Sequence, residues 1–548
     1  MSKRAPTRGR SPSTQTPKSP TRRRRPAPGG RGQSGLRLPA VSGRLAWLLG
    51  AGALVIVAVV VFVIAASGSN EPPANFTGSG DSNFNLANTR DLGGPIDSAN
   101  VSQLHVAWTL PITTKSAYGS YASTPIVSDG VIYSQDLSSN VQAISLQTGH
   151  VLWTKSYESP DQGPNGLVVA DGRVFGTTAT AAFALEEKTG RQLWSVPLVR
   201  NEHEGIDMAP GYHDGVLYVS TVPGNNQKFY GGGGVGILWA LDGATGKKLW
   251  HFDTAPESLW GHPEVNSGGG VWYSPAFDEQ GSLYIGTGNP APFPGTSQYP
   301  WGSSRPGPNL YTDSIVKLNA ATGKLQWYYQ QTPHDLYDHD LQDPPILMQA
   351  GGRQIVVAAG KGGVVVALDR ATGKVLWKQP VGVHNGHDND GLYAMKHEYA
   401  KLKLPESVYP GLLGGVIAPL ATNGSTIFAP VVNLPVNYSS QSENTEGPAE
   451  SGELVALDGA TGAVQWAHKL SAPVFGAATV VNDLVFVTTF SGELMALSTA
   501  SGAVKWRTQL PAGTNTGVAV SGDTLIAPAG FAESGGQQPQ LVAYRLGG

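Results

Sequence analysis

The sequence predicts an all-β fold, an eight-bladed β-propeller, preceded by one transmembrane helix and a disordered N-terminal tail. Three observations predict the propeller. A short motif closed by Trp recurs seven times, and the two ends of the repeat region carry complementary parts of an eighth unit. Charged residues make up only 14% of the chain, and the 548 residues include 71 glycines and 40 prolines, which favours many short strands joined by turns.

The repeated motif is Thr or Ser, then Gly, three further residues and Trp. Its copies end at Trp153, Trp194, Trp250, Trp327, Trp377, Trp466 and Trp506. Each copy has an alternating apolar run, a tight turn and a second run ending in Trp, and upstream segments with Asp-Gly or Asn-Asp turns add two more strands. Four strands make one propeller blade, and each Trp is expected to pack on a neighbouring turn with its N–H bound to a carbonyl.

The incomplete repeats at the two ends complete each other. Trp108 closes a last strand that has no upstream turn, while the final 30 or so residues supply three strands without a closing Trp. Joined, they form blade eight of one closed ring over residues 92–548. An array of separate β-sandwiches is the alternative, but it would not need complementary half-repeats.

The segment before the repeats divides into three parts. Residues 1–44 hold twelve Lys or Arg and no acid, residues 45–66 are 22 uncharged and mostly apolar residues, and residues 67–91 form a Gly/Ser/Asn-rich linker. The apolar run is long enough to span a bilayer, and the positive charge predicts a cytoplasmic, disordered tail with the acidic body outside the cell membrane. A cleaved signal peptide is the alternative. The tail is expected to contact anionic lipid, and no nucleic acid is expected.

Cysteine is absent from the chain. This excludes disulfides, thiolate metal sites and a haem attached through a C-x-x-C-H motif. If the protein transfers electrons, a separate acceptor, a quinone or a cytochrome, has to receive them.

The stretch "TPHDLYDHD", residues 332–340, concentrates acids in a chain that is sparing with charge. Asp335, Asp338 and Asp340 repel one another, so clustering them away from water requires a cation or a proton. On an extended strand, Asp338 and Asp340 would point to one side. A solvated acidic loop is the plain alternative, and His334 and His339 could join a transition-metal site.

Two further stretches stand out, "GGGVWYSPAFDEQGSLYIGTGNPAPF" (268–293) and "VVAAGKGGVVVALDRATG" (356–373). Together with the acid stretch and the repeats, they resemble the quinoprotein dehydrogenases, eight-bladed propellers that hold pyrroloquinoline quinone (PQQ) and Ca²⁺ on the ring axis. The resemblance implies a role for each of five residues. Trp272 would stack on PQQ, Asn289 and Asp338 would bind Ca²⁺, Asp338 would also be the general base, Lys361 would bond the quinone oxygens and aid catalysis, and Asn433 would contact PQQ.

The sequence also departs from the pattern that this resemblance implies. A glutamate ligand for Ca²⁺ is replaced by glycine in "VPGNNQKFYGGGGVGILWALD", where Asn225 or Asn226 would be the substitute. An arginine expected before the second blade is absent from "GPNGLVV", residues 163–169. The stretch "VGVHNGHDND", residues 381–390, reads as a surface excursion between blades, with a second metal site as the alternative.

Two functions follow from these observations. The first is a membrane-anchored PQQ-dependent dehydrogenase that oxidises an alcohol, polyol or sugar outside the cytoplasm. The second is a non-catalytic propeller acting as an envelope scaffold or binding module. Trp272, Asn289, Asp338 and Lys361 favour the enzyme, and the missing glutamate and arginine favour the scaffold.

Overall fold

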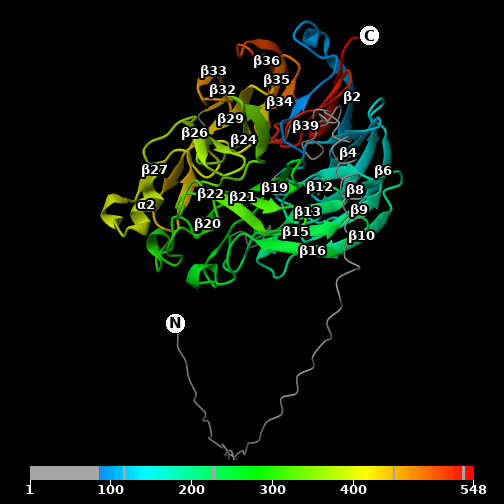
Figure 1. The fold of residues 1–548 in the computed structure, drawn as a ribbon. Helices are drawn as coiled ribbons and strands as arrows, with labels where there is room; N and C mark the ends of the chain where they lie inside the picture. Colours follow the sequence, from blue (N-terminus) through cyan, green and yellow to red (C-terminus); the bar gives the residue numbers. More distant parts are fainter. Residues whose placement is uncertain are drawn as a thin grey trace, which may run out of the picture. The chain divides into compact units, whose positions relative to one another are not determined.

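Among the described residues, seven antiparallel four-stranded sheets and one five-stranded sheet account for the sequence repeats (Figure 1). The structure is a computed structural model that describes residues 86–114, 116, 119–224, 230–448, 451–532 and 537–547. The predicted tail, the predicted transmembrane segment 45–66 and most of the predicted linker lie outside these residues. Among the residues that are described, no helix is both long and apolar enough to cross a membrane.

The blades follow one another in chain order, from cyan through green and yellow to red in Figure 1. Blade 1 consists of β3 (Ile126–Ser128), β4 (Val131–Gln135), β5 (Val141–Ser145) and β6 (Val151–Lys155), and blade 2 of β7 (Leu167–Ala170), β8 (Arg173–Thr177), β9 (Ala181–Glu186) and β10 (Gln192–Pro197). Blade 3 consists of β12 (Gly211–His213), β13 (Val216–Ser220), β15 (Ile237–Asp242) and β16 (Lys248–Asp253), and blade 4 of β18 (Ala276–Phe277), β19 (Ser282–Gly286), β21 (Ser314–Asn319) and β22 (Leu325–Gln330). Blade 5 consists of β23 (Ile346–Ala350), β24 (Arg353–Ala358), β25 (Val364–Asp369) and β26 (Val375–Pro380), and blade 6 of β28 (Ala421–Thr422), β29 (Thr426–Asn433), β32 (Ser451–Asp458) and β33 (Val464–Leu470).

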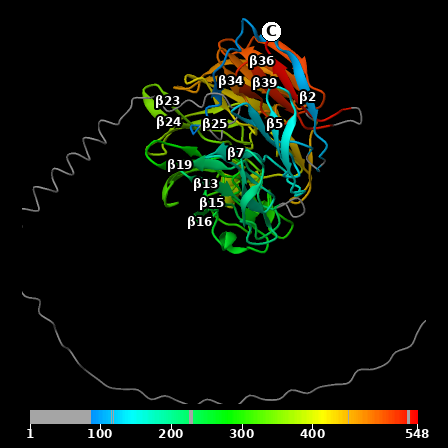
Figure 2. The same ribbon diagram turned by 90° about the vertical axis from the view of Figure 1, so that its right-hand side faces the viewer.

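The last two blades contain the two ends of the described chain. Blade 7 consists of β34 (Thr479–Val481), β35 (Leu484–Thr488), β36 (Glu493–Ser498) and β37 (Val504–Gln509), with β1 (Asp91–Leu92) parallel to β34. Blade 8 consists of β38 (Ala519–Ser521), β39 (Thr524–Ala529), β40 (Gln540–Arg545) and β2 (His105–Pro111). Figure 2 shows β2 and β39 in the same part of the ring, and β40 lies between them in the sheet. The strand that contains Trp108 therefore completes the C-terminal half-repeat, and the predicted closure of the ring is confirmed.

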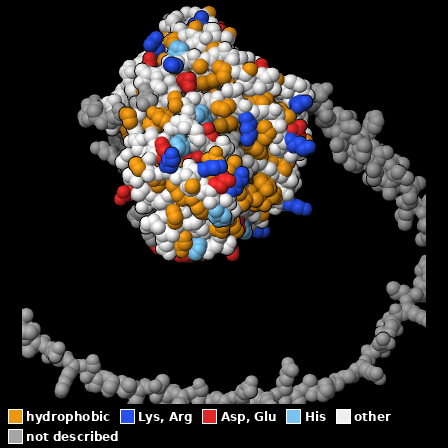
Figure 3. All heavy atoms as spheres, turned by 90° about the vertical axis from the view of Figure 1, so that its left-hand side faces the viewer, with side chains coloured by type: hydrophobic (Ala, Val, Ile, Leu, Met, Phe, Trp, Pro, Cys, Tyr) orange, Lys and Arg blue, Asp and Glu red, His pale blue; other side chains and the backbone are white. Residues whose placement is uncertain are grey.

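Shorter elements lie in the connections between the long strands. They are β11 (Glu204–Gly205), β14 (Val222–Pro223), β17 (Ser267–Gly268), β20 (Pro290–Ala291), β27 (Glu406–Val408), β30 (Val436–Tyr438), β31 (Asn444–Glu446), the helix α2 (Asp390–Met395) and the 3-10 turns Val101–Gln103, Leu259–Gly261, Pro300–Gly302 and Tyr399–Lys401. β27, β30 and β31 form a small sheet on two connections of blade 6. The predicted excursion of residues 381–390 is the start of this addition. On the face drawn in Figure 3, basic, acidic and histidine side chains are mixed rather than gathered by sign.

The repeat tryptophans join each blade to the next, as predicted. The indole N–H of Trp153 donates to the Glu187 carbonyl at 3.0 Å, and the N–H of Trp466 donates to the Thr499 carbonyl at 3.0 Å. Equivalent bonds are made by Trp108, Trp194, Trp250, Trp327 and Trp377. Glycine is required in the covered turns, because a Cβ on Gly190 would lie 2.5 Å from the Trp153 ring. In blade 8 the last two strands, β40 and β2, come from opposite ends of the chain, so no turn joins them beside Trp506. The Trp506 ring packs edge-on against the Tyr544 ring instead.

A short N-terminal segment, residues 86–92, lies along the inner edge of the ring; we call it the axial strap. Its carbonyls at Leu86, Ala87, Thr89 and Arg90 accept the backbone N–H groups of Phe277, Leu347, Thr422 and Val480. These donors belong to the first strands of blades 4, 5, 6 and 7. An inner strand has an unpaired edge that faces the axis, so the strap satisfies backbone donors that would otherwise be buried without a partner.

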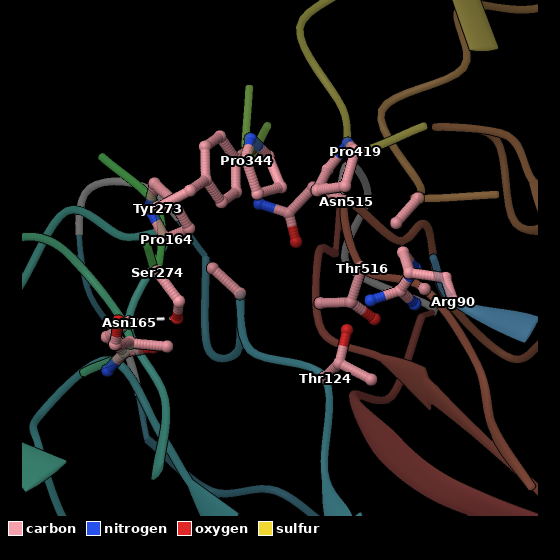
Figure 4. A pocket seen from close by; sticks show the side chains of 14 residues that line it. Arg90, Thr124, Pro164, Asn165, Tyr273, Ser274, Pro344, Pro419, Asn515 and Thr516 are labelled. Carbon is pink, nitrogen blue, oxygen red and sulfur yellow. Dashed lines mark hydrogen bonds between the residues drawn. The ribbon is translucent and has the colours of Figure 1, made fainter. Parts of the chain in front are cut away.

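The first strand of every blade faces a common axial cavity of about 60 Å³ (Figure 4). Each blade lines it with the residue two positions before its first strand: Thr124, Asn165, Ala209, Ser274, Pro344, Pro419, Ala477 and Gly517. This regularity identifies the first strand as the innermost one in all eight blades. The connections that enter these strands therefore converge on the axis, where a shared site can form.

Candidate active site

The acid stretch enters the axis as a turn, not as the predicted extended strand. Asp335 accepts the backbone N–H of Tyr337 at 3.0 Å and that of His339 at 2.7 Å, which closes the chain into a loop. Asp338 lies at the tip with a φ of +65°, a conformation that costs a non-glycine residue roughly 1–2 kcal/mol. The expectation that Asp338 and Asp340 share one side is nevertheless met, because both bind the same ammonium group.

Lys361 is the centre of that arrangement. Its Nζ atom lies 2.9 Å from Asp338 Oδ2 and 2.8 Å from Asp340 Oδ2, and all three side chains are buried. The backbone N–H of Lys361 also donates to the Asp340 carbonyl at 3.0 Å. Close backbone approach at this point needs glycine, since a Cβ on Gly360 would lie 1.8 Å from that carbonyl oxygen. Blade 5 thus supplies both the acids and their counter-charge.

Trp272 and Asn289 come from blade 4 and meet the same acids. The Asn289 backbone N–H donates to Asp340 Oδ1, and the Asn289 side-chain oxygen accepts the Tyr230 hydroxyl. A Cβ on Gly288 would lie 2.9 Å from both Trp272 Nε1 and Asp340 Oδ1, so Gly288 lets the indole and the carboxylate approach each other. Four of the five predicted residues, Trp272, Asn289, Asp338 and Lys361, are therefore brought together.

Asn433, the fifth predicted residue, has a different contact. It ends β29, and its side-chain oxygen accepts the backbone N–H of Val383 at 2.9 Å. Its neighbour Val432 is joined to Gly415 by two backbone hydrogen bonds, and Gly415 packs on the Lys361 carbonyl. Asn433 is thus near the acid loop (residues 332–340) in the fold, but its side-chain oxygen binds the start of the excursion that precedes blade 6 (residues 381–390).

Burial makes the electrostatics of the site unusual. Asp313, Asp335, Asp338 and Asp340 are buried with two cations, Lys361 and Arg305. Burial raises the pKa of Asp313 well above its ordinary value, and charge repulsion from neighbouring aspartates adds to this effect. Burial also raises the pKa of Asp338, which the Lys361 ammonium opposes. The site therefore holds more acid than it can neutralise with its own cations, and it favours an added proton or metal ion.

Arg305 is the largest fully buried side chain. Its guanidinium donates to the Asp335 carbonyl, to Asn309 Oδ1 at 2.7 Å and to the Pro292 carbonyl at 3.0 Å. Burial lowers the pKa of Arg305 to about 10, so it remains a cation at neutral pH. Arg305 ties the acid loop to the segment that follows Asn289. No sequence signal marked it, because two of its three partners are the backbone carbonyls of Pro292 and Asp335, which no side-chain motif reveals.

The excursion of blade 6 covers the acid loop. The Tyr337 hydroxyl donates to Asp390 Oδ2 at 2.7 Å, and His387 Nδ1 lies 2.8 Å from the same oxygen. His339 and His334, considered above as metal ligands, face backbone carbonyls of Pro410 and of Trp301 and Gly307. Burial lowers the pKa of His334 to about 4, which keeps its ring neutral.

The donor set fits a hard cation and a planar anionic ligand. Asp338 Oδ1 has no hydrogen-bond partner within the described residues, and Asp340, which accepts the Asn289 backbone N–H, brings a second carboxylate beside Asn289. No cluster of three or more His, Asp or Glu side chains that could hold a metal by itself occurs in the described ranges. The Trp272 indole and the Lys361 ammonium would suit an aromatic ring bearing negative charge. Asn225 and Asn226 lie outside the described residues.

Comparison with known proteins finds similarity to quinoprotein alcohol dehydrogenases. Residues 93–168 and 206–382 match the family model described as glucose/ethanol/alcohol dehydrogenase, beta-propeller domain, and residues 438–545 match the model of outer membrane protein assembly factor BamB. The chain is 30% identical over 407 residues to the quinohemoprotein alcohol dehydrogenase of Comamonas testosteroni, covering 65% of this chain and 55% of that protein. It is 28% identical over 466 residues to a quinoprotein alcohol dehydrogenase of Pseudomonas putida, covering 71% and 74%.

Solved structures of related proteins share the fold. The Comamonas testosteroni enzyme superposes with a TM-score of 0.71 at 24% identity, covering 86% of this chain and 80% of that chain. A europium-containing methanol dehydrogenase superposes with a TM-score of 0.69 at 19% identity, covering 86% and 98%. The chain spans about half the length of the first curated relatives that it matches.

Proposed function

The predicted resemblance to the quinoprotein dehydrogenases is confirmed, and from it we propose that this chain is a PQQ-dependent dehydrogenase that oxidises an alcohol, polyol or sugar. The observation that carries the proposal is the meeting of Trp272, Asn289, Asp338 and Lys361 at one end of the ring. PQQ, when bound, supplies the two-electron acceptor for this chemistry.

Asp338 is the general base in this proposal. Its Oδ1 atom is without a hydrogen-bond partner in the part of the chain that the structure describes, while Oδ2 is held by Lys361. A carboxylate whose pKa is raised by burial is a stronger proton acceptor than an exposed one, and the Lys361 ammonium favours the ionised form, which can accept the proton of a substrate hydroxyl. Lys361 thereby orients the base, and its positive charge favours an anionic ligand beside it.

The cation would be held by Asn289 Oδ1 and the carboxylates of Asp338 and Asp340. Oxygen ligands of this kind suit Ca²⁺. Because Asp340 adds a second carboxylate, a trivalent ion is a reasonable alternative, and Eu³⁺ belongs beside Ca²⁺ in any titration. Lys361 binds the same two carboxylates, so cation binding is expected to shift its ammonium away from at least one of them.

We also propose that residues 45–66 anchor the chain in the cell membrane, with residues 1–44 in the cytoplasm and the propeller outside it. The basic charge of the tail and the length of the apolar run support this arrangement. Protease added to intact cells should then remove the propeller and spare the tail. Electrons pass to a separate acceptor, since the chain has no cysteine for a covalently attached haem.

Reconstitution tests the proposed function. The full chain, loaded with PQQ and with Ca²⁺ or Eu³⁺, should reduce an artificial dye in the presence of some members of a panel of alcohols and sugars. Asp338→Asn should bind PQQ as the wild type does but lose at least ~100-fold in turnover, the lower range for removing a general base. Full activity in this variant would rule out the assigned base.

A non-catalytic scaffold is the second candidate function. The match of residues 438–545 to the assembly factor BamB supports it, because that part of the ring contains the last two strands of blade 6, blade 7 and three strands of blade 8, and none of the acids of the site. A wild-type chain that binds neither PQQ nor a cation, and turns over no substrate, would favour the scaffold over the enzyme.

A further inference from the structure

Asn289 contributes an oxygen to the candidate cation site only if its amide group is turned the right way. A side-chain amide has one acceptor end and one donor end, and the two are nearly equal in shape. Carboxylates attract the donor end, and Asn289 lies beside Asp340, Asp338 and Lys361. With those acids alone as neighbours, the amide would favour turning its NH₂ group toward the site and would repel a cation.

Two contacts fix the opposite orientation. The Tyr230 hydroxyl donates to Asn289 Oδ1, and Asn289 Nδ2 donates to the Pro290 carbonyl at 3.3 Å. A carbonyl oxygen can only accept, so the Pro290 contact identifies the nitrogen end of the amide, and the remaining end, the oxygen, accepts from the Tyr230 hydroxyl. The Pro290 bond is long and therefore weak. The Tyr230 hydrogen bond adds to it by holding the oxygen end.

The Tyr230 hydroxyl reaches into the middle of the acid cluster. Besides burial, the charges of Asp340, Asp338, Asp313 and Asp335 all raise the pKa of Tyr230, which places the phenol in the field of all four. The ring is held edge-on against Phe293 at 5.4 Å between centroids.

The backbone that presents Tyr230 is fixed on both sides. The Tyr230 N–H donates to the Pro223 carbonyl at 3.1 Å, at the end of β14. The following glycines pass close to other backbone segments: a Cβ on Gly232 would lie 2.2 Å from the Glu264 carbonyl oxygen, and one on Gly234 would lie 2.3 Å from the His203 carbonyl oxygen. The run of glycines therefore permits close backbone packing, and this packing holds Tyr230 in place against Asn289.

We propose that Tyr230 is a positioning residue for the cation site, which holds the oxygen of Asn289 toward the acids through its hydroxyl hydrogen bond. This inference rests on the proposed function, because it assumes that Asn289 binds the cation. Loss of a residue that orients a metal ligand in this way typically weakens metal binding about 10- to 100-fold. The ligand is a hard cation, and the effect is on affinity rather than on the chemical step.

Calorimetric titration of the full, chelator-treated chain with Ca²⁺ in the presence of PQQ tests the proposal. Tyr230→Phe should bind Ca²⁺ about 10- to 100-fold more weakly than the wild type. Tyr212→Phe is the matched control, since it removes a tyrosine hydroxyl that donates to Asp171 in another part of the ring, and it should bind as the wild type does.

A second background separates orientation from folding. Aspartate has two oxygens and no donor end, so Asn289→Asp cannot be turned the wrong way. Tyr230→Phe should therefore have little effect, less than about 3-fold, when it is added to Asn289→Asp, within the usual error of double-mutant cycles. An equal loss in both backgrounds, or unchanged affinity in Tyr230→Phe alone, would overturn the proposal. Absence of Ca²⁺ binding in the wild type would instead overturn the proposed function, on which the inference depends.

Discussion

At the scale of single residues, the site buries more acidic side chains than cationic ones. Lys361 is the group on which this balance depends, because it is within 3 Å of two carboxylates. The two carboxylates and the ammonium are buried, so water does not screen the attraction between them as it would at the surface.

Lys361→Met is expected to destabilise the fold by about 3 kcal/mol at neutral pH, since removing one partner of a buried pair leaves charge uncompensated. The loss should shrink at low pH, where Asp338 and Asp340 take up protons. Urea unfolding at pH 5 and pH 8 measures both effects. The matched control is Lys378→Met, whose ammonium lies over the Tyr329 ring without a buried carboxylate partner in the described structure. Equal, pH-independent losses in the two variants would contradict this account.

A second buried acid pair lies away from the site. The carboxyl groups of Asp161 and Asp207 are both buried, burial raises the pKa of each, and the charge of Asp161 raises that of Asp207 further. A raised folded-state pKa means that the pair stabilises the fold fully below the unfolded value near 4 and loses this contribution as pH rises through the folded value.

Asp207→Asn removes one of these two titrating carboxyl groups. The urea midpoint of this variant should therefore fall less than that of the wild type between pH 5 and pH 8. If both proteins lost stability in parallel over this range, titration of the pair would not be the cause of the wild-type loss.

At the scale of elements, the repeat motif predicted the blades because each of its residues has a fixed local task. Gly allows the left-handed turn, and Trp covers the equivalent turn of the next blade. The order of strands and the closure through Trp108 followed from this pattern. The turn at Asp338 did not, since it depends on two hydrogen bonds to Asp335 that no periodicity signals.

Two glycines of blade 2 separate backbone strain from packing. Gly190 and Gly172 share a φ of +70°, but a Cβ on Gly190 would lie 2.5 Å from Trp153 while one on Gly172 would meet nothing within 4 Å. Gly172→Ala is expected to cost about 1–2 kcal/mol from backbone strain alone. Gly190→Ala should cost about 1–3 kcal/mol more, because it pushes the indole out of its place. Equal urea midpoints for the two variants would refute the role given to Trp153.

The elements that sequence reasoning missed are those defined by long-range contacts. Tyr230 reaches Asn289 from blade 3, and Arg305 reaches the Asp335 carbonyl from a connection of blade 4. Arg305 lies in no repeat or motif, and Tyr230 lies in the stretch in which the glutamate ligand was expected, but nothing in that pattern singles out Tyr230 itself. The excursion of residues 381–390 was placed correctly between blades, but its cover over Tyr337 depends on the contact with Asp390.

At the scale of the whole molecule, the ring is closed by strands from opposite ends of the chain. His105 and Arg545 are Cα partners across β2 and β40, and the natural chain has no cysteine. His105→Cys combined with Arg545→Cys should form a disulfide that changes mobility on a non-reducing gel. His105→Cys combined with Lys469→Cys, which places the second thiol in blade 6, should not. Crosslinking of both pairs, or of neither, would contradict the closure.

The central claim is that segments from separate blades assemble one cofactor site on the ring axis. An anomalous difference map from crystals of the full chain grown with PQQ and Eu³⁺ tests it most directly. The account predicts one strong peak at about 2.3–2.6 Å from Asn289 Oδ1 and from oxygens of Asp338 and Asp340, with planar density against the Trp272 indole. Saturated crystals with no peak at these oxygens, or with the quinone on another face of the ring, would contradict it.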